Sequence, residues 1–291
     1  MLTDDDFPLP LSEIIRANVA LALAEDLGPG DLTASLIPAN RRAKAELVSR
    51  EAGVLCGQAW FNACFTSLDP DVKIKWQPEE GASIAAGQTL CEISGNARAL
   101  LSGERAALNF LQMLSGVASQ TRRYVDCVRD THAVIVDTRK TLPGLRLAQK
   151  YAVRVGGGGN HRFALWDAIL IKENHIAAAG GIRAALEAAE RLAQSEPSCR
   201  FVQIEVENLN DMKTALAAGA TMLLLDNFTV PLLEKAVALN RELGSPALLE
   251  ASGGATLKTL ARIAATGIDR VSVGALTKHI KALDLSLRVT P

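Results

Sequence analysis

A lysine, a glutamate, an asparagine and a histidine follow one apolar run with no spacer between them. The run covers residues 168–171, and its unbroken apolar character is typical of a strand that is buried on both faces. Lys172, Glu173, Asn174 and His175 come directly after it. An ammonium, a carboxylate, an amide and an imidazole grouped in this way indicate a place where an ionic ligand binds or reacts.

Other apolar runs end in charged groups too, and the signs of these groups are sorted along the chain. Any single charged group is explained as a solvated loop charge, but the sorting of the charges by sign is not. This sorting predicts a face with one half suited to a polyanion and the other suited to a divalent metal. The cationic members come first, at the early strand ends and in the loop between them, and are Arg139, Lys140, His161, Arg162 and Lys172; the anionic members follow and are Glu205 and Asp226.

Small residues follow the last two apolar runs. They are Ser252, Gly253 and Gly254 after one run, and Ser272, Val273 and Gly274 at the other. In β/α barrels the final loops commonly bind phosphate through backbone N–H groups and a helix N-terminus. The four glycines at 156–159 allow close backbone approach to a ligand, and they fit a flexible loop equally well. The chain carries neither a Rossmann glycine motif nor a P-loop.

Six apolar runs alternate with alanine- and leucine-rich helical segments, which indicates a parallel sheet in a barrel or a doubly wound fold. Their spacing is irregular and six is too few for a complete barrel, so we expect an incomplete barrel. In βα architectures active sites gather at the carboxyl ends of the strands. The runs are 133–136, 168–171, 201–204, 222–225, 247–250 and 270–273.

The first third of the chain mixes helices and short strands. Helices are predicted at 11–27, with Ser12 as N-cap and Gly28 as terminator, and at 59–68. A long helix is predicted to start at Ser102. The glycine-punctuated strands that precede this helix resemble a lipoyl-type hairpin module without its modified lysine, and we interpret these strands as scaffold. Arg105 in the first turn of that helix is either a surface arginine or faces an anion outside its own domain.

Composition excludes several classes of protein. The chain has 291 residues, 48% of them apolar and 22% charged, and a net charge of −1, which favours a globular protein over a nucleic-acid or membrane-surface binder. The N-terminus lacks the pattern of a signal peptide, and no apolar run is long enough to span a bilayer. Five scattered cysteines predict buried, reduced thiols without a zinc site, and hence a cytoplasmic location.

Several long motifs resemble the quinolinate phosphoribosyltransferase family. They are VDTRKTLPGLR (136–146), GGGGNHRFALWDAILIKENHI (156–176), IEVEN (204–208), LLDNF (224–228) and EASGG (250–254), with EDLGPGDLTASLIP (25–38) and LSGERAALNFLQMLSGVAS (101–119) before them. The resemblance implies an N-terminal α/β sandwich domain at 1–115, joined by a C-terminal tail at 277–291. It also implies an incomplete, about seven-stranded β/α barrel at 116–276.

The resemblance also implies a reaction, in which quinolinate and phosphoribosyl pyrophosphate give nicotinate mononucleotide, carbon dioxide and pyrophosphate, with Mg²⁺ and no organic prosthetic group. Lys140, Lys172, Glu205 and Asp226 are the implied catalytic residues, and Glu205 and Asp226 would also hold the metal. It implies a homodimer, which some members assemble further, with Arg105 contributed by the partner subunit. The implied quinolinate site is Arg105, Thr138, Arg139, Lys140, His161, Arg162 and Lys172; the implied donor site is Glu205, Asp226, Ser252, Gly253, Gly254, Ser272, Val273 and Gly274.

Three other functions stay open on the sequence. A Schiff-base aldolase would use Lys172 as its nucleophile, because neighbouring cations lower the pKa of a lysine. A non-catalytic carrier would use the N-terminal hairpin module. A phosphoribosyltransferase of the same fold would take another acceptor, although an acceptor with one carboxylate leaves part of the cationic pocket unpaired.

Overall fold

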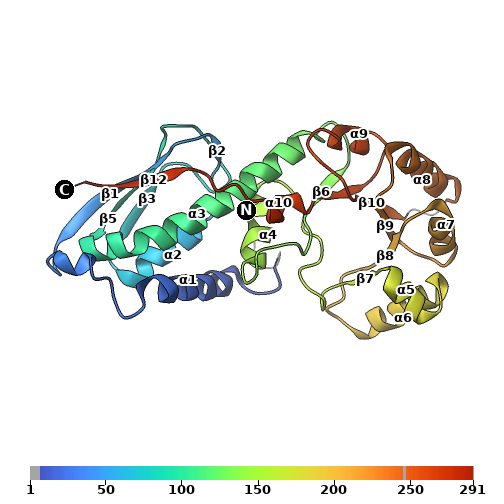
Figure 1. Ribbon diagram of the computed structural model, residues 1–291, viewed down its shortest axis with the longest axis horizontal. Helices are drawn as coiled ribbons and strands as arrows, with labels where there is room; N and C mark the ends of the chain where they lie inside the picture. The colour runs from blue at the N-terminus through green and yellow to red at the C-terminus, as the bar shows by residue number, and fades with distance from the viewer. Residues whose placement is uncertain (1–6, 245–246, 291) are drawn as a thin grey trace. The chain divides into compact units, whose positions relative to one another are not determined.

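The computed structural model describes residues 7–244 and 247–290, which form two compact units (Figure 1). Unit 1 takes in the described residues of Met1–Arg122, Thr141–Gly157 and Ala275–Pro291. Unit 2 takes in Arg123–Lys140 and the described residues of Gly158–Gly274. The domain boundary that the sequence predicts between residues 115 and 116 stays a prediction.

Unit 1 contains a four-stranded antiparallel sheet in the order β12-β1-β5-β3. Along β1 the residues Ala45, Leu47 and Ser49 are buried while Lys44 and Glu46 are exposed, as expected for a sheet covered on one face. A separate pair joins β2 to β4. The strands of unit 1 are β1 (Arg42–Ser49), β2 (Gly53–Val54), β3 (Lys73–Trp76), β4 (Ser83–Ile84), β5 (Thr89–Asn96) and β12 (Leu285–Thr290).

Helices pack with this sheet and provide its aromatic core. Trp60, Phe61 and Phe65 of α2 are fully buried, and the Phe61 ring lies edge-on to Trp76 with 5.2 Å between centroids. The predicted helices 11–27 and 59–68 are confirmed. The helical segments are α1 (Leu11–Leu27), the short 3₁₀ turn η2 (Ala34–Leu36), α2 (Gln58–Leu68), α3 (Ala97–Asp126), which continues past the end of unit 1, α4 (Arg146–Val155) and α10 (Ala275–Lys278).

Two predicted helix starts are wrong. The N-cap of α1 is Pro10 rather than Ser12, because the carbonyl of Pro10 accepts from the N–H groups at positions 13 and 14. Helix α3 begins at Ala97 rather than at Ser102, because the Asn96 side chain accepts from the N–H groups of the next turn. Arg105 therefore lies beyond the first turn of its helix.

Unit 2 is a six-stranded parallel sheet in the order β6-β11-β10-β9-β8-β7, and all six predicted strands are confirmed. The residues of β9 from Met222 to Leu225 are all buried, because α6, α7 and α8 lie on the outer side of the strands (Figure 1). The strands are β6 (Val134–Val136), β7 (Ile169–Ile171), β8 (Val202–Val206), β9 (Met222–Asp226), β10 (Leu248–Ser252) and β11 (Arg270–Ser272). The helices are α5 (Glu173–Ala179), α6 (Ile182–Ser195), α7 (Leu209–Ala217), α8 (Val230–Glu242) and α9 (Leu260–Ala264).

The barrel is open, as predicted, because β6 and β7 end the sheet and do not pair with each other. Among the described residues, the barrel sheet of unit 2 has six strands instead of about seven. At the outer edge of β6 a single parallel bridge joins Val136 to Gly159, where a further strand would lie. The fold is thus an incomplete β/α barrel with an N-terminal α/β domain. Among the described residues, no helix combines the length and apolar character needed to cross a bilayer.

Candidate active site

A cavity of about 490 Å³ lies in unit 2 at the carboxyl ends of the strands. It brings together ten predicted site residues that are spread over more than 130 positions of the sequence. These residues are Thr138, Arg139, Lys140, His161, Arg162, Lys172, Glu205, Asp226, Ser252 and Ser272. Charged groups of both signs that lie far apart in the sequence therefore meet around one cavity.

The order of the strands explains how the groups are arranged. Because neighbouring parallel strands end at the same edge, each strand adds its own residues to the rim. Cations occupy both ends of the sheet, and hydroxyls and carboxylates lie between them. In sheet order the cavity residues are Thr138, Arg139 and Lys140 after β6, Ser272 in β11, Ser252 in β10, Asp226 in β9, Glu205 in β8 and Lys172 after β7.

Two guanidinium groups form the basic side of the cavity. Arg162 is 9% exposed, and burial together with the charge of Arg139 lowers its pKa, against the opposing effect of Asp167. Within the described part of the chain, the buried Nε of Arg139 has no hydrogen-bond partner. Two cations that repel each other, Arg162 buried and Arg139 half-buried with an unused donor, are suited to an anionic ligand that enters from solvent.

The acidic side carries Glu205 and Asp226. The ammonium of Lys172 contacts Oε2 of Glu205 at 2.5 Å. Asp226 accepts a hydrogen bond of 2.7 Å from Asn227 Nδ2. No cluster of three or more metal-binding side chains occurs among the residues described. Two carboxylates fit Mg²⁺, which usually binds one or two carboxylates and takes its other ligands from substrate phosphates and water.

Only one of the four polar residues that follow β7 belongs to the cavity. Lys172 lines it, whereas Nδ1 of His175 accepts the backbone N–H of Lys172 at 3.0 Å and thereby caps α5. Glu173 and Asn174 are exposed and bond to each other. The compact KENH sequence thus combines one site residue with a helix start.

The serine–glycine loops after β10 and β11 differ from the expected phosphate site in two respects. Gly253 and Gly254 adopt φ of +90° and +65°, but α9 does not follow directly and begins only at Leu260. No helix N-terminus therefore adjoins the loop after β10, whereas α10 begins at Ala275, directly after Gly274. The backbone N–H of Val273 donates to Val136 across the sheet at 2.9 Å, so it is engaged in strand pairing.

Three residues that line the cavity were not predicted: Leu170, Leu224 and Glu250. Gln203 and Asp137 are fully buried nearby, and Asp137 accepts from Asn160 Nδ2 at 2.7 Å and from the N–H of His161 at 3.0 Å. For two of these five residues, Gln203 and Glu250, the sequence carries a signal. Gln203 and Glu250 interrupt apolar strands, and Gln203 shares a face of β8 with Glu205 because side chains alternate along a strand.

His161 lines the cavity but is not one of its cations. Its Nδ1 accepts the backbone N–H of Arg162 at 2.7 Å, so this nitrogen carries no proton and the imidazole is neutral. The prediction of a positive charge at His161 is therefore wrong. The prediction for the cysteines is corrected as well: all five are free, but Cys127 is exposed and Cys199 is half-buried.

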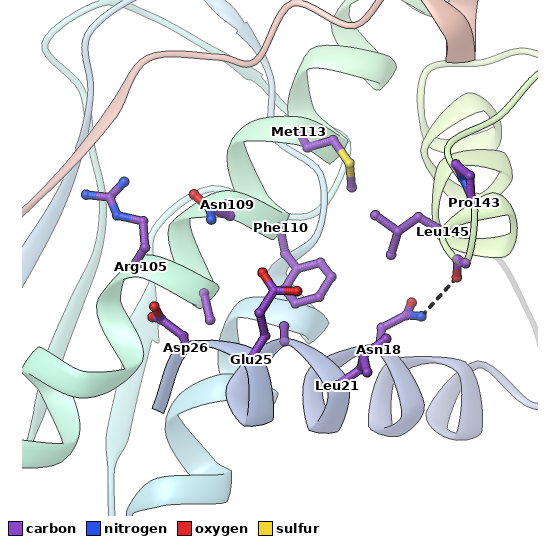
Figure 2. Close-up of a pocket in the computed structure, with 13 residues that line it drawn as sticks. Asn18, Leu21, Glu25, Asp26, Arg105, Asn109, Phe110, Met113, Pro143 and Leu145 are labelled. Atoms are coloured by element: carbon purple, nitrogen blue, oxygen red, sulfur yellow. Dashed lines mark hydrogen bonds between the residues drawn. The ribbon is translucent and has the colours of Figure 1, made fainter. Parts of the chain in front are cut away.

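Arg105 belongs to unit 1 and lines a different cavity, of about 350 Å³ (Figure 2). It projects from α3, and Glu25 and Asp26 reach the same cavity from α1. Phe110 and Met113 provide an apolar wall. Arg105 is thus exposed to a surface hollow of its own unit and is absent from the lining of the unit 2 cavity.

Comparison with known proteins places both units in one enzyme class. Residues 31–115 match the family model of the quinolinate phosphoribosyl transferase N-terminal domain, and residues 117–288 match that of its C-terminal domain. The chain is 42% identical over 268 residues to a probable nicotinate-nucleotide pyrophosphorylase (carboxylating) of Bacillus subtilis, covering 91% of this chain and 90% of that protein. It is 42% identical over 295 residues to the Mycobacterium leprae enzyme of that name, covering 99% of each.

Solved structures agree. The nicotinate-nucleotide pyrophosphorylase of Francisella tularensis is 42% identical, with a TM-score of 0.91 over the whole of both chains. Human nicotinic acid phosphoribosyltransferase, at 15% identity and a TM-score of 0.60 over 94% of this chain and 74% of that one, shares the fold alone. The open barrel with its sorted cavity is that of a pentosyltransferase. The chain belongs to the quinolinate phosphoribosyl transferase family.

Proposed function

We propose that the protein transfers the phosphoribosyl group of phosphoribosyl pyrophosphate to quinolinate, with loss of carbon dioxide, in NAD biosynthesis. The observation that carries the proposal is the single cavity that Arg139 and Arg162 line together with the carboxylates Glu205 and Asp226. Quinolinate is a pyridine with two adjacent carboxylates, and its partner substrate carries phosphates that bind Mg²⁺. The two halves of the cavity match these two substrates.

The acceptor binds on the basic side. Arg139 and Arg162 each present a planar set of N–H donors that a carboxylate accepts in pairs, and the unused Nε of Arg139 adds a further donor. Lys140 and Thr138 lie at the same end of the sheet, and Lys172 lies at the other end. His161 contributes the shape of the pocket rather than charge, because its ring is neutral.

The donor binds on the acidic side. Glu205 and Asp226 would hold Mg²⁺ and the ribose hydroxyls, and the ion, when bound, neutralises the charge of the pyrophosphate. Ser252, Gly253 and Gly254 would bind the 5′-phosphate together with Ser272, Val273 and Gly274. The hydroxyls of the two serines and the amides of the glycines are the donors in this set. The N–H of Val273 bonds to Val136, so this residue holds the loop in place.

The reaction has two steps. The bond from ribose C1 to pyrophosphate breaks toward an oxocarbenium ion, lysines stabilise the leaving charge, and the pyridine nitrogen bonds to C1. The 2-carboxylate then leaves as carbon dioxide, and its electron pair stays on the ring carbon next to the cationic nitrogen until that carbon takes up a proton. The basic pocket holds the ring oriented and dry, so most of its effect is orientation and electrostatics.

We further propose a homodimer, able to assemble further, in which Arg105 serves the cavity of the partner subunit. The position of Arg105 at a surface hollow, away from the lining of the cavity in unit 2, supports this assignment. We also propose a cytoplasmic location, which the free thiols support, because a reducing compartment maintains them.

The direct test mixes the protein with phosphoribosyl pyrophosphate, Mg²⁺ and quinolinate labelled in its 2-carboxylate, and measures labelled carbon dioxide and nicotinate mononucleotide. Both products are expected in equal amounts, and neither without Mg²⁺. Nicotinate replaces quinolinate in the parallel reaction and should give little nucleotide. Turnover of nicotinate as fast as that of quinolinate would overturn the choice of acceptor.

The aldolase hypothesis is disfavoured by the ion pair of Lys172 with Glu205, because a Schiff base needs the neutral amine. Borohydride treatment in the presence of a carbonyl substrate should leave the mass of the protein unchanged. The carrier hypothesis predicts a lipoyl or biotinyl mass increment, which an intact-mass spectrum would reveal.

A further inference from the structure

A chain of buried polar side chains links Glu250, at the cavity wall, to His161. We propose that Glu250 is a positioning residue for the acceptor: through Gln203 it fixes the tautomer of His161, and His161 in turn holds the backbone of Arg162. The inference rests on the proposed function, because it assigns its effect to the binding of quinolinate by Arg162.

The contacts of the chain are short and continuous. Nε2 of Gln203 donates to Oε2 of Glu250 at 3.2 Å, and Oε1 of Gln203 lies 2.8 Å from Nε2 of His161. Nδ1 of the same ring accepts the backbone N–H of Arg162 at 2.7 Å. Gln203 and Glu250 are fully buried and His161 is 5% exposed, so solvent does not compete for these bonds.

The directions of the hydrogen bonds are set jointly by the two ends of this series, the backbone N–H of Arg162 and the carboxylate of Glu250. A backbone N–H only donates, so Nδ1 of His161 has no proton and Nε2 carries it. Nε2 then donates to the carbonyl oxygen of Gln203, which leaves the amide NH₂ of Gln203 for an acceptor. Glu250 provides that acceptor, and as a carboxylate it offers oxygen alone.

The charge of Glu250 supports the same tautomer. Its Oε1 lies 3.6 Å from Nε2 of His161 and has no hydrogen-bond partner among the described residues. A negative oxygen at this distance favours the proton on Nε2 rather than on Nδ1. Burial raises the pKa of Glu250 to about 6 although Gln203, Ser272 and Arg270 lower it, so the carboxylate is ionised at neutral pH.

Removal of the carboxylate of Glu250 would disrupt the whole series of hydrogen bonds from Gln203 to Arg162. Without an oxygen at position 250, Gln203 turns its NH₂ toward His161, and the imidazole proton moves to Nδ1. That proton then faces the N–H of Arg162, so two donors meet and the backbone at Arg162 has to move. A displacement of about 1 Å at a substrate-positioning group is enough to cost roughly 100-fold in rate.

The test reads the tautomer of His161 by NMR in protein labelled with ¹⁵N and ¹³C at histidine. His161 in the wild type should show the Nε2–H form, Glu250→Gln should keep it because it keeps an acceptor oxygen, and Glu250→Met should show the Nδ1–H form. His175, whose Nδ1 accepts a backbone N–H elsewhere, is the internal reference and should not change. Gln203→Met breaks the same link from the other side and replaces Glu250→Met if that variant does not fold.

Kinetics complete the test. In Glu250→Met the KM for quinolinate should rise about tenfold or more, and in Glu250→Gln it should rise less, while the KM for phosphoribosyl pyrophosphate stays close to wild type in both variants. An Nδ1–H form in the wild type, or an unchanged tautomer and unchanged quinolinate KM in both methionine variants, would overturn the proposal. Failure of the proposed function is separate: the wild type would not turn over quinolinate, whereas the tautomer is read without any substrate.

Discussion

Arg139 and Arg162 are unusual as single residues, because both line one cavity, where Arg162 is buried and Arg139 is half-buried. Lysine has the charge of arginine but not its planar set of donors. We therefore expect Arg139→Lys to lose one charge-assisted hydrogen bond or more, about 1.5–3 kcal/mol each, which lowers kcat/KM for quinolinate roughly 10- to 100-fold. Steady-state kinetics measure this change.

Arg129→Lys is the matched control for that substitution. Arg129 is an exposed arginine whose side chain is 67% accessible and lies 3.5 Å from Asp126. Exposed pairs contribute about 0–1 kcal/mol, so this variant should keep its kinetics. Near-normal quinolinate turnover in Arg139→Lys would show that a point charge suffices at this position.

The stability of the folded protein should depend on pH through Glu250, and the raised pKa of this carboxyl group fixes the sign of the dependence. Its pKa is about 6 in the folded protein, against 4.5 for the free group. The folded state therefore holds this proton more tightly, and the contribution to stability is present below pH 4.5 and lost as the pH rises to about 6. At about 1.4 kcal/mol per pKa unit the loss is about 2 kcal/mol.

Urea unfolding of the wild type and of Glu250→Gln from pH 4 to pH 7.5 isolates this term, because glutamine does not titrate. The difference between the two free energies of unfolding should change by about 2 kcal/mol across the window. A constant difference would mean that the Glu250 carboxyl titrates as it does in the unfolded chain.

Residue types alone predicted which groups meet, but not what each one does. The charges of Arg139, Glu205 and Asp226 are visible in the sequence because they follow apolar runs, and that of Arg162 because it lies in the loop between two such runs. The neutral state of His161 depends on one backbone N–H, and the role of Glu250 depends on a buried partner in another strand. Tertiary contacts of this kind leave no pattern in a single sequence.

At the scale of elements, the turn after β10 requires glycine more strongly at position 253 than at position 254. A Cβ at Gly253 would lie 2.2 Å from Oδ1 and 3.2 Å from the backbone nitrogen of Asn227, whereas a Cβ at Gly254 meets nothing within 4 Å. Both have positive φ. Gly253→Ala should therefore destabilise the protein by about 1–3 kcal/mol more than Gly254→Ala.

Thermal unfolding compares the two variants, and the KM for phosphoribosyl pyrophosphate checks the link to function. Gly253→Ala should raise that KM more than Gly254→Ala, since the clash moves the loop that carries Ser252. Equal stability and equal KM in the two variants would contradict the close approach of Asn227.

Strands were easier to predict than helix starts, for a physical reason. The strands of unit 2 are largely apolar because helices cover the sheet, so the apolar runs of the sequence identify them. The start of a helix depends on one cap, and for α3 the cap is Asn96, whose role is only apparent once its side chain is seen to accept two N–H groups. Serine at position 102 instead donates to Asp31.

At the scale of the whole molecule, the shared active site of the proposed dimer can be tested by mixing subunits. Arg105→Ala and Lys172→Ala should each be nearly inactive as pure dimers. In an equal mixture half of the dimers are mixed, and each has one intact cavity of two, so activity should return to about a quarter of wild type for a symmetric dimer.

Exchange of subunits through mild denaturant and assay of quinolinate turnover would show this recovery. The matched mixture of Lys172→Ala with Asp226→Ala, two residues that line the same cavity, should yield no comparable recovery. Activity that stays near zero in the first mixture would place Arg105 outside the partner's site.

The opening between β6 and β7 has a consequence for how such a protein can diversify. In a closed barrel the number and stagger of the strands fix the width of the ring. Here β6 and β7 do not pair, and the open edge of β6 is bonded to Gly159, whose N–H donates to Ile135 and whose carbonyl accepts from the N–H of Asp137. Insertions or deletions near this joint would resize the mouth without repacking any strand, so new acceptors are most readily accommodated there.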